Sequence, residues 1–225
     1  MVWIGQFFNS SLGAKYLMAL TGAGAYLFLI GHILGNLNMF LGADAMNSYA
    51  LTLKTLPFGA LWIARIGLVF VFGIHILMAI KLTRANKSAR PVSYSKPSTV
   101  QASLASRTMP LTGLVVLAFL IFHLAHFTWR IVAYDGPLID TSGRDDVYTM
   151  VLQGFQQPVI SMFYMLAMLL VGFHLSHGAK SMFQTLGLNN KKYNLLITTA
   201  PPLLGWVVAL LGVSIPIAVL VGIIS

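Results

Sequence analysis

The stretch that decides the fold is PLTGLVVLAFLIFHLAHFTWRI, which runs from Pro110 to Ile131. A helix of about 20 mostly apolar residues suffices to cross the hydrocarbon core of a bilayer. Four further stretches have the same character: Tyr16–Phe40, Phe58–Ile80, Pro158–Gly178 and Leu195–Ile224. Because backbone groups inside lipid must be bonded within the segment, all five are expected to be helices. The sequence therefore predicts an all-α integral membrane protein, with residues 1–225 as a single transmembrane domain.

The composition supports this fold class. Hydrophobic residues make up 57% of the chain and charged residues only 8%, which excludes a water-soluble globule. Since cysteine is absent, the chain cannot hold disulfides, thiolate-ligated iron–sulfur clusters or covalently attached c-type haem. The N-terminal MVWIGQFFNSS has neither a basic region nor a cleavage signal, so no removable targeting peptide is expected.

Prolines predict where some of the helices begin. A proline is tolerated in the first turn, where its missing N–H has no helical partner. Pro110 and Pro158 are therefore expected to open the third and fourth helices. Pro201, Pro202 and Pro216 fall within or near the fifth, which predicts a late start or a kink in that helix.

Loop charges predict the orientation in the membrane. Basic residues without any acid occupy the second-to-third and fourth-to-fifth loops: Lys81, Arg84, Lys87, Arg90, Lys96, Arg107, Lys180, Lys191 and Lys192. The third-to-fourth loop is instead rich in acid, with Asp135, Asp140, Asp145 and Asp146. The positive-inside rule then places the N-terminus in the cytoplasm, in a multi-pass protein of the cell inner membrane. The basic inner face could bind anionic lipid or a cytoplasmic partner.

All six histidines lie inside or at the end of a predicted span, where ionisable groups are costly and often functional. His32, His75, His123 and His174 lie at similar distances along the first four helices, about 15 residues from each start. Alternating helix directions then place His32 and His123 at one level in the outer half, and His75 and His174 at one level in the inner half. Two such pairs suit two bis-histidine haems in a bundle of the first four helices. Nearby glycines either make room for a macrocycle or serve tight helix packing: Gly31, Gly35, Gly73 and Gly172.

The third and fourth helices each carry a second histidine, in FHLAHFTWR and FHLSHGAKS. The spacing puts His126 near the face of His123, and His177 near that of His174. Such a pair could chelate zinc, although no intramembrane acid completes that site. We take His126 and His177 as neighbours of a haem propionate or quinone, or as donors to a ligand; their use as ligands stays open. Candidate propionate partners are Arg65, Arg130, Lys180 and Ser181, although snorkelling also explains Arg130 and Lys180.

These segments resemble the dihaem cytochrome b membrane anchor of succinate dehydrogenases and quinol:fumarate reductases (complex II), of the single-chain five-helix type. The resemblance covers nearly the whole chain. It rests on SSLGAKYLMALTG (10–22), GHILGNLNMF (31–40), GIHILMAI (73–80), FHLAHFTW (122–129) and, most specifically, FHLSHGAKSMFQTLGL (173–188).

The resemblance implies a non-catalytic subunit that carries two b haems and part of a quinone site. A flavoprotein subunit with FAD and an iron–sulfur subunit would sit on the cytoplasmic side, and the quinone would be menaquinone or ubiquinone. His75 and His174 would hold the haem nearer the iron–sulfur subunit, and His32 and His123 the distal one. Ser11 and Lys15 match the spacing of a quinone-site pair in related anchors, although an N-cap serine and an interfacial lysine also explain them. Some relatives move protons through a glutamate near the fourth-helix ligand, but this chain contains no Glu.

Three other readings remain at this stage. One is the cytochrome b subunit of a formate dehydrogenase or hydrogenase, which also combines haem histidines with a basic inner face. Another is a transporter that binds a transition metal at its H-x-x-H helices, for which the lack of acidic residues in the spans is unfavourable. The last is a structural anchor without haem, which the four depth-matched histidines disfavour.

Overall fold

The computed structural model describes residues 5–7, 10–89, 104–134 and 138–225. Within these ranges the regular structure is helical, apart from one isolated bridge between Ile139 and Asp145. Five helices are long and apolar enough to cross a membrane, which confirms the predicted number: Ser11–Leu41, Pro57–Ser88, Ser106–Thr128, Pro158–Thr185 and Asn194–Leu220. Three charged loop residues of the sequence analysis, Arg90, Lys96 and Asp135, lie outside the described residues.

Short irregular turns extend three of the long helices. The helix α2 (Ser11–Asn36) continues into the 3-10 turn η1 (Leu37–Leu41), and the 3-10 turn η2 (Pro57–Gly59) precedes α4 (Ala60–Ser88). The helix α5 (Leu104–His123) continues into a π-helical turn, η3 (Leu124–Thr128). The remaining long helices are α7 (Pro158–Thr185) and α8 (Asn194–Leu220).

The prolines agree with the sequence prediction at one helix of three. Pro158 is the first residue of α7, as predicted. Pro110, by contrast, lies inside α5, which already begins at Leu104. For the fifth helix the sequence predicts a late start or a kink. The late start is wrong, because α8 begins at Asn194 and contains all three of its prolines, whereas the kink stays a prediction. Neighbouring helices can bond the backbone groups near a proline inside the membrane, and the Tyr26 hydroxyl of α2 donates to the Pro201 carbonyl at 2.8 Å.

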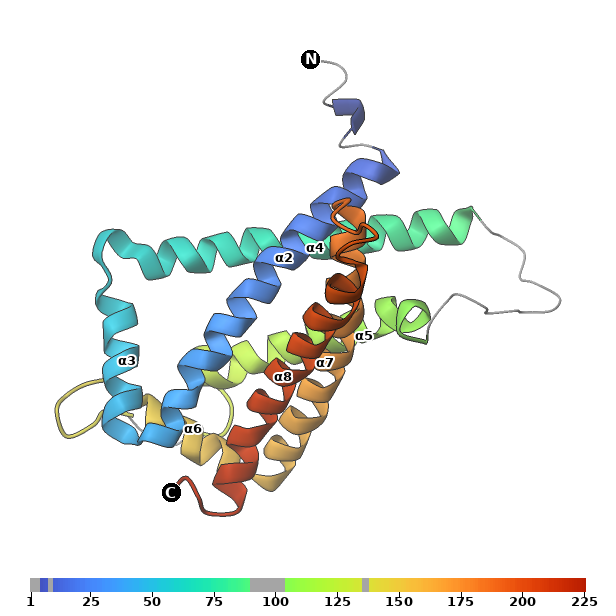
Figure 1. Ribbon diagram of the computed structural model, residues 1–225. Coiled ribbons are helices and arrows are strands. Elements are labelled where there is room, and N and C mark those ends of the chain that lie inside the picture. The colour runs from blue at the N-terminus through green and yellow to red at the C-terminus, as the bar shows by residue number, and fades with distance from the viewer. Residues whose placement is uncertain (1–4, 8–9, 90–103, 135–137) are drawn as a thin grey trace.

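The long helices form two pairs that meet at one contact. In the first pair α4 packs against α2, and in the second α5 packs against α7. The helices α2 and α7 join the two pairs, and α8 packs along α7 on the other side (Figure 1). Among the described long helices, α4 packs closely against α2 alone, and none of its residues is fully buried. The two pairs therefore face each other without closing into a tightly packed four-helix core.

Glycines separate into two groups by what surrounds them. A Cβ on Gly172 would lie 2.8 Å from the Cβ of Ala209 and 2.9 Å from the Trp206 ring, so this glycine lets α7 and α8 approach closely. Gly35 likewise lies directly under the Tyr49 ring. Gly31 and Gly73 have no such neighbour within 4 Å. Of the four glycines that the sequence analysis considered beside histidines, only these last two leave open space.

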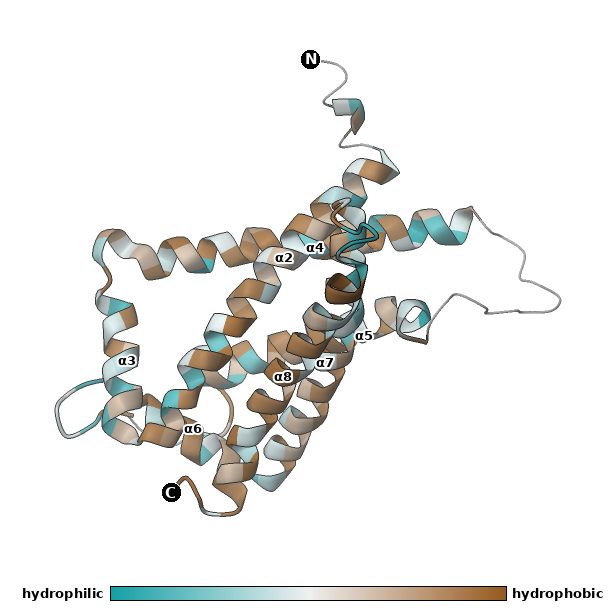
Figure 2. Ribbon diagram, viewed as in Figure 1, coloured by the Kyte–Doolittle hydropathy of each residue, from teal (hydrophilic) through white to brown (hydrophobic). Residues whose placement is uncertain are grey.

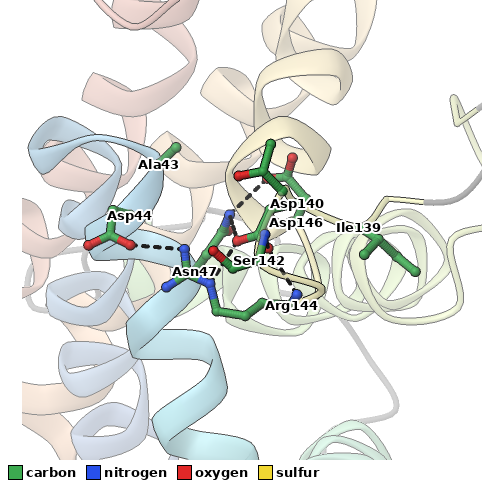
Figure 3. A pocket seen from close by; sticks show the side chains of 9 residues that line it. Ala43, Asp44, Asn47, Ile139, Asp140, Ser142, Arg144 and Asp146 are labelled. Carbon is green, nitrogen blue, oxygen red and sulfur yellow. Dashed lines mark hydrogen bonds and ion pairs between the residues drawn. The ribbon is translucent and has the colours of Figure 1, made fainter.

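Two shorter helices, α3 (Ala43–Thr55) and α6 (Val147–Gln156), lie at one end of the long helices (Figure 1). A network of polar side chains ties α3 to the segment before α6, and we call this network the clasp. Its members are Asp44, Asn47, Ser48, Lys54, Arg130, Asp140, Arg144, Asp145 and Asp146. Several of them line a polar pocket of about 440 Å³ (Figure 3).

Two hubs organise the clasp. The buried Asn47 donates to Asp140 and Asp146 at 3.3 and 3.0 Å, and its oxygen accepts from the Tyr148 backbone. Arg144 bonds to Asp140 and Asp44 at 2.7 and 2.9 Å (Figure 3). It also bonds to the Ser48 hydroxyl at 2.7 Å. Charged groups next to a membrane are thus neutralised in pairs, which fixes the long third-to-fourth loop.

Asp145 holds the other side of the clasp. It accepts two hydrogen bonds from the Arg130 guanidinium, at 2.8 and 2.6 Å, and one from Lys54. The hydrogen bonds from Arg130, with that from Lys54, outweigh burial and hold the pKa of Asp145 at about 2, well below its usual value. Asp145 is therefore ionised throughout the physiological range.

This depressed pKa predicts a pH-dependent contribution to stability. Asp145→Asn is expected to lower the free energy of unfolding by about 1 kcal/mol at pH 7, since partly exposed ion pairs are screened by solvent. Because the folded pKa lies below the unfolded one, the contribution is full above about pH 4 and is lost as the pH falls through about 2. Thermal unfolding in detergent at several pH values measures it. Asp44→Asn is the control and should have little effect, because the Asp44 side chain is exposed. If Asp145→Asn lowered the free energy of unfolding as much at pH 2 as at pH 7, the assignment would be contradicted.

The helix ends that lie away from the clasp are basic. Figure 2 shows polar residues gathered at the end of α4 and at the connection between α7 and α8, with apolar helices between these regions and the clasp. The described basic residues there are Lys15, Lys81, Arg84, Lys87, Arg107, Lys180, Lys191 and Lys192. The molecule thus has a clasp end, which contains every described acid, and a basic end.

Candidate functional site

His32 of α2 and His123 of α5 meet between the two helix pairs. Their ring centroids are 5.8 Å apart and their planes are almost perpendicular, at 89°. Two metal–imidazole bonds of about 2 Å each place ring centres roughly 6 Å apart, so this separation fits two ligands on one metal atom. Both rings are half-buried, and both lie towards the clasp end of their helices. The structure therefore brings together the pair that the sequence predicts for the outer level.

His75 and His174 are the predicted second pair of ligands. The ring of His75 lies against α2, and the ring of His174 lies against α5. The Nδ1 atom of His75 is 3.3 Å from the Thr21 hydroxyl of α2. The Nδ1 atom of His174 is 3.1 Å from the Thr112 hydroxyl of α5. Each ring is half-buried.

The threonine contacts favour one tautomer of these rings. The Thr21 hydroxyl donates its proton to the Leu17 carbonyl at 2.6 Å, and the Thr112 hydroxyl donates to Met109 at 3.1 Å. Both oxygens are therefore left to accept, and the Nδ1 atoms of His75 and His174 donate to them. The lone pair of each ring is then on Nε2, which is the arrangement that a metal ligand needs.

His32 has the same tautomer through a different contact. Its Nε2 lies 3.3 Å from the side-chain amide nitrogen of Asn36. An amide nitrogen can only donate, so the Nε2 of His32 is the acceptor and carries the lone pair. This bond is long, and a metal atom could replace it.

Tyr164 of α7 joins His123 to His126. Its hydroxyl is 2.9 Å from the Nδ1 of His126 and 3.4 Å from the Nδ1 of His123. The hydroxyl of Tyr164 is therefore within hydrogen-bonding distance of both rings.

His126 has entirely different surroundings. It is fully buried, and it packs on Tyr134, Phe127 and Phe155. Its Nε2 has no hydrogen-bond partner and faces Gly154, on which a Cβ would lie only 2.7 Å away. An enclosed nitrogen of this kind cannot reach a metal atom between the helix pairs without repacking. The π-helical turn η3, which contains His126, follows directly after His123, and such turns are frequent at functional sites.

The other candidates lie around the four histidines without converging on them. His177 bonds to Ser181 at 3.1 Å, one turn further along α7. Arg65 is exposed on α4, with its guanidinium 4.9 Å above the Trp62 ring. Arg130 is paired with Asp145 in the clasp, and Lys180 is exposed at the basic end. Their roles towards a propionate stay predictions.

The quinone candidates lie in the first turn of α2. Ser11 and Lys15 are both exposed there. The N-cap of α2 is Ser10, whose side chain accepts from the Gly13 backbone, so Ser11 does not cap the helix. The explanation of Ser11 as a helix cap is therefore wrong, and its role in a quinone site stays a prediction.

The sequence analysis missed the groups that orient the histidines: Thr21, Thr112 and Tyr164. Each is a hydroxyl residue on the helix packed against the one that carries its histidine. Thr21 and Thr112 both precede a glycine, and His75 and His174 lie against those glycines, with Cε1 3.3 and 3.5 Å from the Cβ positions of Gly22 and Gly113. The repeated Leu-Thr-Gly, at 20–22 and 111–113, is the signal in the sequence that could have found two of the three.

No three His, Asp or Glu side chains gather among the described residues in a way that could hold a metal ion by themselves. The geometry is one of histidine pairs. No protein-family model, curated protein or solved structure matches this chain.

Proposed function

We propose that the chain is the membrane-anchor and electron-transfer subunit of a succinate:quinone oxidoreductase, with two bis-histidine b haems. The observation that carries the proposal is the arrangement of four histidines on four different helices. His32 and His123 face each other, and the Nδ1 atoms of His75 and His174 each contact a threonine hydroxyl of the neighbouring helix. A metal-ligating histidine commonly donates its other nitrogen to a neighbouring group, as these contacts allow.

The residues fit haem better than a bare metal ion. Two axial imidazoles complete the ligand set of a haem iron, whereas a structural zinc site needs four ligands. Among the described long helices α4 packs closely against α2 alone, so the two helix pairs do not close on each other along α4. Haem supplies reversible one-electron transfer when it is bound.

The residues of the chain then have distinct tasks. His32 and His123 are the ligands of one haem, and His75 and His174 of the other. Thr21, Thr112 and Tyr164 orient three of these rings. Arg65 is the proposed cationic partner of a haem propionate, because Arg130 is already paired with Asp145. The surrounding apolar helices exclude water, which together with ligand identity tunes the potential.

The charge distribution supports the orientation and the partners. We assign the basic end to the cytoplasm by the positive-inside rule, so that the clasp end with its described acids lies outside. The flavoprotein and iron–sulfur subunits would then dock at the basic end, next to His75 and His174. Ser11 and Lys15 at this end are the proposed contacts for the quinone.

The test of this proposal is the haem content of the full chain, purified from membranes in mild detergent together with its associated subunits. A pyridine-haemochrome assay is expected to give about two b haems per chain. Flavin and iron–sulfur subunits should be identified in the same preparation. Zinc without porphyrin would contradict the proposal in favour of a transporter, and a co-purifying formate dehydrogenase or hydrogenase subunit would contradict the assignment to complex II.

A further inference from the structure

The chain contains two copies of one helix-pair pattern. The segments Leu20–His32 and Leu111–His123 have the same residue at seven of thirteen positions, which read L-T-G-x5-F-L-I-x-H. The following helices share a second pattern, G-x-H-x5-K, in 73–81 and 172–180. In each copy the first pattern lies on the helix that packs against the helix with the second, α2 with α4 and α5 with α7.

The side-chain contacts repeat as well. In the first copy His75 bonds to Thr21 and lies on Gly22, and in the second His174 bonds to Thr112 and lies on Gly113. The hydroxyl of each threonine also donates to a carbonyl of its own helix. Glycine at the next position gives the imidazole room to lie against the neighbouring helix. Each Thr-Gly pair therefore forms a contact site for one histidine ring, and the chain contains two such sites.

We infer that Thr21 and Thr112 are equivalent positioning residues, which hold His75 and His174 in the Nδ1–H tautomer so that both Nε2 atoms are presented to one shared metal. The inference deepens the proposed function and rests on it for the identity of the metal. Each helix pair alone contributes a single ligand of this level. The site is complete only when the two copies face each other.

The physical reason lies in the acceptor role of the two hydroxyls. A threonine oxygen that has given its proton to a carbonyl can stabilise only a ring that donates to it. The opposite tautomer would leave this oxygen without a donor and would place a proton on Nε2, where a metal must bind. Donation from Nδ1 also increases the basicity of the ligand, which stabilises the oxidised metal.

The tautomer can be measured without any haem. In the haem-free full chain, 15N-labelled on histidine, NMR chemical shifts distinguish protonated from unprotonated ring nitrogens. The wild type is expected to show Nδ1–H for His75 and His174. Thr21→Val should abolish this preference at His75 alone, and Thr112→Val at His174 alone. Nε2–H in the wild type, or no change in both variants, would overturn the inference.

A second readout uses the loaded protein. Loss of the hydrogen bond is expected to raise the midpoint potential of the haem held by His75 and His174, in the same direction in both variants. About a tenfold shift in the ratio of reduced to oxidised haem corresponds to about 59 mV for one electron. Thr198→Val is the matched control, because this hydroxyl bonds to carbonyls of its own helix. An unchanged potential in both variants would also overturn the inference.

The two readouts separate this inference from the proposed function. A preparation that never contains haem, but shows the Nδ1–H tautomers and their loss in the variants, contradicts the proposed function and supports the positioning role. The opposite result is a preparation with two haems, in which the histidine tautomers and the midpoint potential are unchanged in Thr21→Val and Thr112→Val. This result would contradict the positioning role alone.

Discussion

Replacing His75 with alanine is expected to lower the haem content from about two per chain to about one, while the second haem keeps its spectrum. The reason is the pairing of the rings. His75 and His174 contact Thr21 and Thr112 in the same way, and we propose that they share one haem. A haem that loses one of its two axial imidazoles loses half of the bonds that hold it in a chain without cysteine. No other described histidine is placed to replace the lost ligand, because His177 is bonded to Ser181.

The pairing makes the whole mutation series predictable. His174→Ala should remove the same haem as His75→Ala, and the double variant should lose no more than either single one. His32→Ala and His123→Ala should remove the other haem, since these rings are 5.8 Å apart. Reduced-minus-oxidised spectra and redox titration of each variant measure which haem is left. If His75→Ala kept both spectral signals, the pairing would be wrong.

His126→Ala and His177→Ala are the matched controls in this series, because each removes a histidine three residues after a proposed ligand. Both haems should survive in each variant. For His126 this expectation depends on burial, since its ring is enclosed by aromatic side chains and its Nε2 faces Gly154. Loss of a haem in His126→Ala with retention in His123→Ala would exchange the roles of the two residues.

The membrane fold could be read from the sequence because its cause is local. Each span needs only length and apolar character, and all five were predicted, with ends that differ by a few residues. The depth match of His32 with His123 follows from the same arithmetic of helix rise, and the two rings do meet. Pro110 and the prolines of α8 were misjudged because the sequence does not show which neighbouring groups satisfy the backbone around them.

Features that depend on the partner of a helix could not be predicted in this way. The H-x-x-H spacing puts His123 and His126 near one face, and both do reach Tyr164, but only the packing reveals that His126 is enclosed. The clasp joins Asn47 to residues about one hundred positions away, which no local pattern indicates. The repeated Leu-Thr-Gly is visible in the sequence, but its meaning depends on the knowledge that α2 packs on α4 and α5 on α7.

The tolerance of Gly73 and Gly172 for a side chain also depends on the neighbouring helix and cannot be predicted from the sequence. Their substitution gives the second large expected effect. Gly73 and Gly172 are equivalent in the repeated pattern, each two residues before its histidine. A Cβ on Gly172 would lie 2.8 Å from Ala209 and 2.9 Å from Trp206, whereas nothing lies within 4 Å of a Cβ on Gly73. Equivalent positions in the sequence therefore have opposite tolerance for a methyl group.

Gly172→Ala is expected to lower the free energy of unfolding by about 1–3 kcal/mol, because neither the Ala209 Cβ nor the Trp206 ring can withdraw without separating α7 from α8. Thermal unfolding in detergent measures the loss, and Gly73→Ala is the matched control, with an unchanged unfolding temperature in the haem-free chain. In the haem-loaded protein the control has a further use. Residues two positions apart on a helix do not share a face, so a methyl group on Gly73 points away from His75. Haem content should therefore be unchanged in Gly73→Ala, while Gly172→Ala weakens the fold. Equal destabilisation by the two variants would show that α4 packs against more than α2, and the two helix pairs would then be closed rather than open between the histidines.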